Sequence, residues 1–164
     1  MISWVYSLVL IELAIVSWFD IKIKKIPNLW SLFNLFVGLS LHFLYPEAYP
    51  WQLASILFPL GWLVLGFGLF LVGVMGAGDS KLLASLFLLI PLGLQPYMLE
   101  KLIYSTVVVG IVMLLFKFSR DFQKIKAYAF TSYWKGFFEA VRSRFSYAPV
   151  ALLAWLLLGV HLWK

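Results

Sequence analysis

The residues best able to do chemistry in this chain are two aspartates set against long apolar stretches. Asp79 stands in the polar hexapeptide Gly76–Lys81, and the apolar stretches on either side of it, Leu53–Met75 and Leu82–Leu99, carry no charge. Asp20 stands at the end of the first apolar run. A carboxylate beside such segments is costly in a bilayer unless it is paired or functional. Asp20 and Asp79 are therefore the first candidates for a shared site.

Two carboxylates held close together can perform hydrolysis without a metal. They cannot both ionise easily, so the pKa of one rises and the pair holds a single proton. One member then acts as general base on a water, while the other donates a hydrogen bond to the scissile carbonyl. This is aspartyl protease chemistry, and it needs neither a cofactor nor a nucleophilic side chain.

The residues around Asp79 suggest supporting roles. Gly76 and Gly78 lack a Cβ, so a substrate backbone can approach them closely. Lys81 has two readings that the sequence leaves open: it contacts the ionised carboxylate or the substrate, or it only anchors a helix end at the membrane surface. Asp79 itself has an alternative role as the N-cap of the helix that follows it.

Three further polar positions lie near the first aspartate. Pro27 and Asn28 predict the start of a second helix, with Asn28 as its N-cap. Glu12 lies eight residues before Asp20, which on a helix is roughly 12 Å along the axis. That distance is too great for Glu12 to pair with Asp20, so Glu12 stays outside the predicted catalytic set and its role stays open.

Composition places these residues in a membrane protein. The chain of 164 residues is 63% apolar, has a mean hydropathy of +0.96, and only 12% of its residues are charged. A soluble domain of this size cannot bury so much apolar surface. We predict an all-α, polytopic membrane protein with a single domain over residues 1–164. A span needs about 20 apolar residues, and the six candidates are residues 2–19, 29–45, 53–75, 82–99, 102–116 and 145–163.

The basic residues set the expected orientation in the membrane. All of them except Lys101 and Lys164 fall in the loops after the first, third and fifth predicted spans. The positive-inside rule puts those loops in the cytoplasm and both termini outside, in the inner (cytoplasmic) membrane. Asp20 and Asp79 then lie at the cytoplasmic boundary, on helix ends that can be neighbours. Because the net charge of +6 resides in these loops, it indicates a membrane and not a nucleic acid partner.

The long segment 117–144, between the last two predicted spans, has a helical pattern of its own. Apolar and aromatic residues recur there every three or four positions, and basic residues fill the other face. We expect one or two amphipathic helices lying on the anionic inner leaflet.

The remaining inventory excludes several other kinds of site. The chain has no cysteine, which excludes disulfides and thiolate metal sites, and two histidines are too few for a histidine-only zinc site. His42 and His161 fall toward the membrane face opposite the two aspartates, so no serine–histidine pair is expected. We expect no metal and no cofactor.

The motifs resemble those of the type IV prepilin peptidases. Asp20, followed by a basic segment and Ile26-Pro27-Asn28, is similar to the first motif of that family. The hexapeptide from Gly76 to Lys81 is similar to the second, the Gly-x-Gly-Asp-x-Lys signature of polytopic aspartyl proteases. Tyr147-Ala148-Pro149, before the last apolar run, is a shorter match. The resemblance covers the whole chain in motif order, spacing and number of spans.

The resemblance implies a specific activity. Family members cleave the leader of prepilin-like substrates of type IV pilus and secretion systems on the cytoplasmic side, next to the substrate's apolar helix. The paired aspartates that activate the water correspond to Asp20 and Asp79. Larger, bifunctional members carry a cytoplasmic insertion, often with a cysteine-pair zinc site, and also N-methylate the new terminus. Here only seven residues separate Asp20 from Asn28. The chain resembles the short form, and N-methyltransferase activity is not carried over to it.

Two alternatives remain beside the prepilin peptidases. The presenilin-type proteases share Gly-x-Gly-Asp, but they are larger and their first aspartate follows a tyrosine, whereas Phe19 precedes Asp20 here. A non-enzymatic membrane component of a pilus or secretion system, or a small transporter, would explain Glu12 and the basic segment 117–144. It would not require the two aspartates to approach each other.

Overall fold

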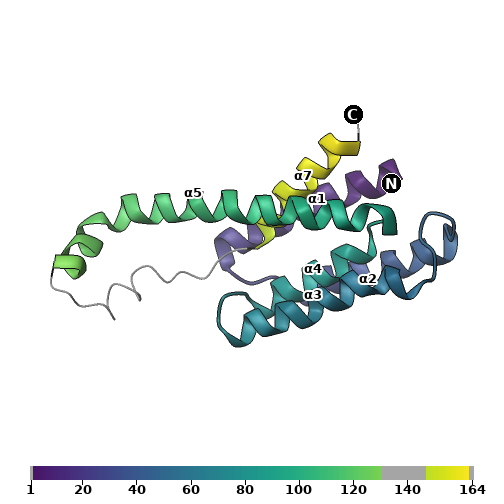
Figure 1. Ribbon diagram of the computed structural model, residues 1–164, viewed down its shortest axis with the longest axis horizontal. Helices are drawn as coiled ribbons and strands as arrows, with labels where there is room; N and C mark the ends of the chain where they lie inside the picture. Colours follow the sequence, from purple (N-terminus) through teal and green to yellow (C-terminus); the bar gives the residue numbers. More distant parts are fainter. Residues whose placement is uncertain (1, 131–146, 163–164) are drawn as a thin grey trace.

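The computed structural model describes residues 2–130 and 147–162, and the helices within these ranges are joined by short connections with no strand among them (Figure 1). The helices are α1 (Ser3–Ile23), α2 (Asn28–Leu44), α3 (Leu53–Leu71), α4 (Ala77–Leu88), α5 (Gln95–Phe130) and α7 (Ala148–Leu162), with the 3-10 helix η1 (Leu92–Leu94) before α5. The prediction of an all-α protein is confirmed.

The helices have the lengths and surfaces of a polytopic membrane protein. Helices α1 and α3 and the stretch Leu92–Arg120 are long and apolar enough to cross a bilayer, and α2 and α7 are shorter apolar helices. Large apolar side chains stay exposed on the outside of the bundle, as with Phe36 at 72% and Leu53 at 85%. Lipid is the solvent that tolerates such a surface, which confirms the membrane assignment.

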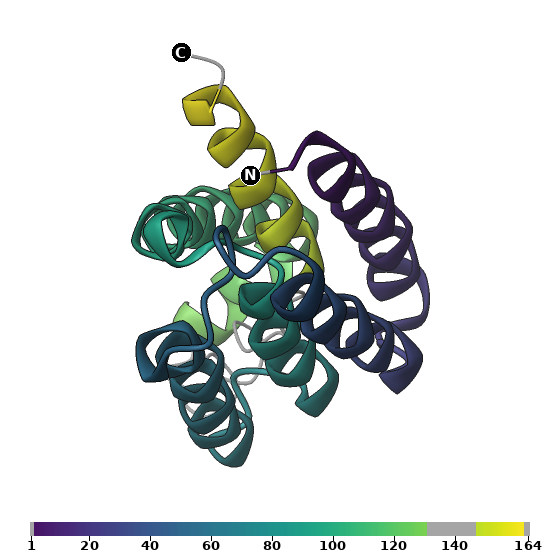
Figure 2. The same ribbon diagram turned by 90° about the vertical axis from the view of Figure 1, so that its right-hand side faces the viewer.

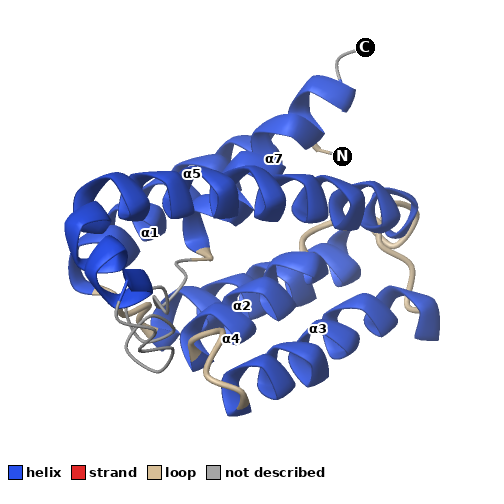
Figure 3. Cartoon of the chain, turned by 60° about the vertical axis from the view of Figure 1, so that its left-hand side comes forward, coloured by secondary structure: helices blue, strands red, loops and turns tan. Residues whose placement is uncertain are grey.

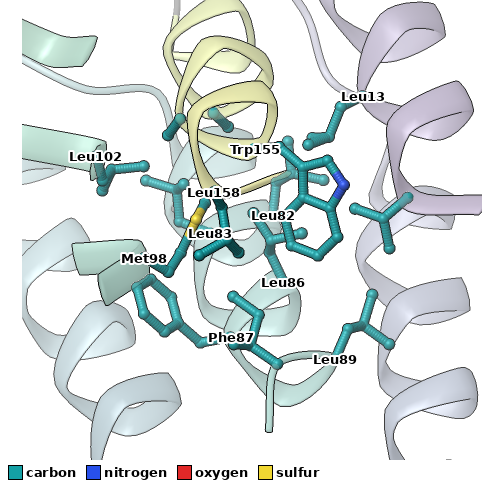
Figure 4. Close-up of a cluster of buried hydrophobic side chains, with 14 of the residues drawn as sticks. Leu13, Leu82, Leu83, Leu86, Phe87, Leu89, Met98, Leu102, Trp155 and Leu158 are labelled. Carbon is teal, nitrogen blue, oxygen red and sulfur yellow. The ribbon is translucent and has the colours of Figure 1, made fainter. Parts of the chain in front are cut away.

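Helix α4 lies at the centre of the bundle. It packs against α2 and α3, while α7 packs against α1 and α5 (Figure 2). Figure 3 shows α2, α4 and α3 side by side in one layer, with α1, α5 and α7 across from them. Every residue from Leu82 to Phe87 is buried. The side chains of α4 meet those of the other helices in one core, drawn in Figure 4, which includes Leu13, Leu82, Leu83, Leu86, Phe87, Met98, Leu102, Trp155 and Leu158.

The C-terminal end of α4 is buried, and side chains from outside the helix bond carbonyls of its last turn and of the two residues that follow it. The last carbonyls of a helix have no intrahelical partner, so burying them without hydrogen bonds is costly. Gln95 Nε2 donates to the carbonyl oxygens of Phe87 and Ile90 at 3.2 and 3.3 Å. The hydroxyl of Tyr49 donates to the carbonyl oxygen of Leu89 at 3.1 Å. These bonds fix the point at which α4 ends.

The same Gln95 side chain also repairs a break in α3. Pro59 lies inside α3 and has no N–H, so it cannot bond the carbonyl of Ser55 one turn earlier. Gln95 Nε2 donates to that carbonyl oxygen at 3.3 Å. One buried amide thus ties the proline site of α3 to the end of α4.

The predicted span over residues 82–99 is wrong as a single helix. Helix α4 begins earlier, at Ala77, and ends at Leu88, and the chain then turns through Pro91 before α5 begins. A proline disfavours helical geometry in the residue before it, which explains the stop. Helix α5 contains the predicted span 102–116 and continues to Phe130, so the first part of the predicted amphipathic segment 117–144 belongs to it. The remainder of that segment, from 131 onward, lies outside the described residues.

A buried polar pair joins α1 to α2. Asn34 Nδ2 donates to Glu12 Oε1 at 2.9 Å, and both side chains are buried, at 0% and 3% exposure. A carboxyl group inside a helical bundle is costly unless it has a hydrogen-bond partner. The amide of Asn34 supplies that partner, which gives Glu12 a structural role in holding α1 beside α2.

Replacing Asn34 by alanine should destabilise the fold, because Glu12 would keep its burial and lose its donor. We expect a loss of about 1 kcal/mol, the size of such bonds within membranes. Thermal unfolding followed by circular dichroism in detergent micelles measures it. Ser40→Ala is the matched control, since Ser40 Oγ bonds only the Phe36 carbonyl of its own helix. Equal melting temperatures for Asn34→Ala and Ser40→Ala would contradict the role of the pair.

Candidate active site

Asp20 lies in the last turn of α1, where it is buried at 5% exposure. The sequence placed it in the loop after a shorter helix, so the helix boundary was predicted too early. The helix ends at Lys24, which adopts the left-handed conformation with φ 53° and donates its N–H to the Asp20 carbonyl at 3.0 Å. The chain therefore turns away just beyond Asp20, which leaves this carboxyl at the buried end of α1.

Asp79 lies in the first turn of α4 and is buried at 7% exposure. The alternative role of Asp79 as N-cap is wrong: Gly76 is the N-cap, and Asp79 folds back so that its Oδ2 accepts the Gly76 N–H at 3.0 Å. A Cβ on Gly76 would lie 2.7 Å from that oxygen. Glycine at this position leaves the room in which the Asp79 carboxylate sits.

The second glycine of the hexapeptide brings the α1–α2 connection against α4. A Cβ on Gly78 would lie 3.0 Å from the carbonyl oxygen of Ile26 and 3.1 Å from its Cβ. The absence of a Cβ at Gly76 and Gly78 thus lets the Asp79 carboxylate and Ile26 lie close to the α4 backbone. The close approach of a substrate backbone to these two glycines stays a prediction.

The two aspartates line one cavity of about 390 Å³. It opens between the end of α1, the α1–α2 connection and the α3–α4 connection, which lie at the same end of the bundle, opposite the two chain termini (Figure 1). The other residues that line it are Lys24, Lys25, Ile26, Phe70, Gly73, Val74, Met75, Gly76, Ala77 and Gly78. The structure therefore brings Asp20 and Asp79 together, although 58 positions separate them in the sequence.

The surroundings of Asp79 favour the protonated form of its carboxyl group. Burial and, after it, the negative charge of Asp20 raise the pKa of Asp79 to about 6, against the opposing effect of the hydrogen bonds from the N–H groups of Gly76 and Tyr147. Gly76 and Tyr147 directly precede α4 and α7, so two helix N-termini face one carboxylate. Burial and the charge of Asp79 also raise the pKa of the Tyr147 hydroxyl.

The other predicted residues lie beside the cavity. Lys81 Nζ donates a hydrogen bond to Asn28 Oδ1 at 3.4 Å. The structure therefore shows Lys81 bonded to Asn28 and not to the Asp79 carboxylate, which was one of its predicted contacts. Asn28 is the first residue of α2, and Pro27 stands in the N-cap position that was predicted for Asn28. The Lys81–Asn28 bond links the starts of α4 and α2.

Sequence reasoning missed the two lysines on the wall of the cavity, and it found Tyr147, whose N–H bonds the Asp79 carboxylate, only by resemblance. Lys24 and Lys25 were counted as charges that set the orientation, and nothing in their spacing marked them as lining a cavity. Tyr147 belonged to the short Tyr-Ala-Pro match. Among the described residues, no group of three or more acidic or histidine side chains could hold a metal ion.

The family comparison agrees with this geometry. Residues 7–163 match the type IV leader peptidase family, a range that includes both aspartates and the helices that hold them. The chain belongs to the type IV leader peptidase family. Searches of curated proteins and of solved structures found no match. The cavity of Asp20 and Asp79 is thus a feature of a membrane protein of a leader peptidase family.

Replacing Asp20 by asparagine should lower the pKa of Asp79, because it removes the negative charge that disfavours ionisation. In the native chain Asp79 keeps its proton up to a pH of about 6 and releases it above. Infrared titration of ¹³C-aspartate-labelled protein in nanodiscs measures the midpoint, with Asp79→Asn identifying the band. The control is Glu47→Gln, which changes an exposed carboxyl group outside the cavity. An unchanged midpoint in Asp20→Asn would show that the two groups do not interact.

Proposed function

We propose that this protein is a membrane-embedded aspartyl endopeptidase that removes the leader peptide of type IV prepilin-like substrates at the cytoplasmic membrane face. The observation that carries the proposal is the cavity lined by both Asp20 and Asp79, in a chain of the type IV leader peptidase family. The raised pKa of Asp79 supports it further, since a pair that holds one proton near neutral pH is what such hydrolysis needs.

The pair activates a water with no other reactive group. The ionised carboxylate accepts a proton from the water, whose oxygen attacks the scissile carbonyl carbon. The protonated carboxyl donates a hydrogen bond to the carbonyl oxygen, where negative charge develops. The tetrahedral intermediate then collapses, and the carboxyl group that took the proton from water donates it to the leaving nitrogen as the C–N bond breaks. One of the two aspartates carries the shared proton at the start of this cycle, and the other is the ionised base.

The charge distribution supports a cytoplasmic site. The cavity lies at the end of the bundle that carries the α1–α2 and α3–α4 connections, with Lys24 and Lys25 on its wall (Figure 1). Basic connections favour the cytoplasmic side, which puts both termini outside in the inner membrane. The substrate there is a prepilin-like protein with a leader and an apolar helix embedded in the same bilayer.

The alternative of a small transporter or non-enzymatic component has lost one of its two grounds. That alternative rested on the basic segment 117–144 and on Glu12, an acid inside the membrane with no assigned partner. Glu12 now has one, because it accepts a hydrogen bond from Asn34 at 2.9 Å. The peptidase proposal accounts for Asp20 and Asp79 together, and the alternative assigns them no common role.

Replacing either Asp20 or Asp79 by asparagine should abolish leader removal, because each single change destroys the pair. We expect a loss of at least about a hundredfold in the rate, the usual contribution of an acid–base group. Co-expression with a prepilin-like precursor and a gel-shift assay measures it. Asp121→Asn makes the same chemical change at the third aspartate of the chain, on α5, and should leave processing intact. Full cleavage by Asp20→Asn or Asp79→Asn would sink the proposal.

A further inference from the structure

An apolar groove lies over α4, between α2 and α3. Its volume is about 800 Å³, its walls include Leu35 of α2 and Leu60 of α3, and Ala84 of α4 forms part of its floor. The wall side chains are exposed, with Leu35 at 41% and Leu60 at 55%. Both α2 and α3 pack against α4, which contributes Ala84, Ser85 and Leu88 to the groove.

The groove lies near the cavity of the two aspartates. A third hollow of about 490 Å³ lies between α3 and the first turn of α4. It shares Phe70 and Ala77 with the aspartate cavity, and it shares Leu63 and Lys81 with the groove. The three hollows therefore adjoin one another around the start of α4, from the cavity of Asp79 to the groove.

We propose that this groove holds the apolar helix of the membrane-anchored substrate while the adjoining segment of the same polypeptide lies between Asp20 and Asp79. The inference rests on the proposed function. A protease that cuts its substrate beside an apolar helix must bind the cleavage site at the membrane boundary and, at the same time, the adjoining helix of that substrate within the bilayer. The hollow lined by Phe70 and Lys81 lies between the aspartate cavity and a large apolar surface.

The dimensions and ends of the groove fit a helix. It runs from Asn28 at the start of α2 to His42 in its last turn, and this stretch of the helix extends about 22 Å at the 1.5 Å rise of an α-helix. That length is about three quarters of the roughly 30 Å hydrocarbon core of a bilayer. The polar groups Asn28 and Lys81 lie at the end nearest the aspartates. The small side chain of Ala84 on the floor permits the close backbone approach by which helices associate in membranes.

A lipid chain could fill the same apolar surface, but it has no peptide segment to pass to the aspartates. The adjoining hollows therefore favour a helix of the substrate over a lipid. A photoreactive side chain on the groove wall distinguishes the two occupants, because it forms a protein–protein adduct with a substrate helix and a protein–lipid adduct with a lipid chain.

Site-specific photo-cross-linking tests the inference. A photoreactive phenylalanine analogue replaces Leu35 or Leu60 in the Asp79→Asn background, which leaves the substrate uncut. The probe is an epitope-tagged prepilin-like precursor from the same genome, co-expressed in the membrane. The matched controls are Ile111 and Leu114 of α5, exposed at 52% and 54% and outside the groove. We expect a several-fold larger cross-linked fraction at the groove positions.

Equal cross-linking at the groove and α5 positions, or adducts with lipid alone at Leu35 and Leu60, would overturn the inference. The chain with both native aspartates is assayed in parallel for cleavage of the same precursor. Cleavage without groove cross-links refutes the groove and leaves the proposed function standing. A precursor that stays uncut refutes the proposed function, and the inference falls with it.

Discussion

The carboxylate of Asp79 is held at a buried helix start, and its position depends on α4 being fixed at both ends. At the C-terminal end, Gln95 and Tyr49 bond the last carbonyls, so α4 can stop inside the bundle without bare polar groups. At the N-terminal end, the Gly76 N–H bonds the Asp79 carboxylate directly. A shift of α4 by one residue would rotate Asp79 away from Asp20 and leave both ends without these partners.

Opposing electrostatic effects act on the Asp79 carboxylate, and together they set its pKa. Burial and the charge of Asp20 favour the protonated form, while the N-termini of α4 and α7 favour the ionised form. The result is a pKa of about 6, well above the ordinary value of an aspartate yet within the physiological range. Glu12, deeper along α1, has a different environment, because the neutral amide of Asn34 is its partner. Glu12 thus has a structural role between α1 and α2, whereas Asp20 and Asp79 line the cavity at the membrane boundary.

Hydropathy and charge were enough to predict the membrane architecture and to bring Asp20 and Asp79 to one end of it. They were not enough to place the helix break after Leu88. An average over the apolar run 82–99 hides Pro91 and Gly93, although those residues were visible signals of a turn. The roles of the two glycines were beyond the sequence, because Gly78 accommodates Ile26, a residue 52 positions away. The partner of Lys81 was hidden for the same reason, since Asn28 belongs to another helix.

The central claim is that Asp20 and Asp79 lie across one cavity in the membrane, and the absence of cysteine from the chain allows a direct measurement of it. The double variant Asp20→Cys/Asp79→Cys is treated in native membranes with a short bifunctional thiol reagent, and the internal cross-link is quantified by mass spectrometry. The account predicts efficient cross-linking for this pair, and little for Asp20→Cys/Lys101→Cys, whose second position lies on α5 outside the cavity. Equal yields for the two pairs, or no internal cross-link between positions 20 and 79, would contradict it.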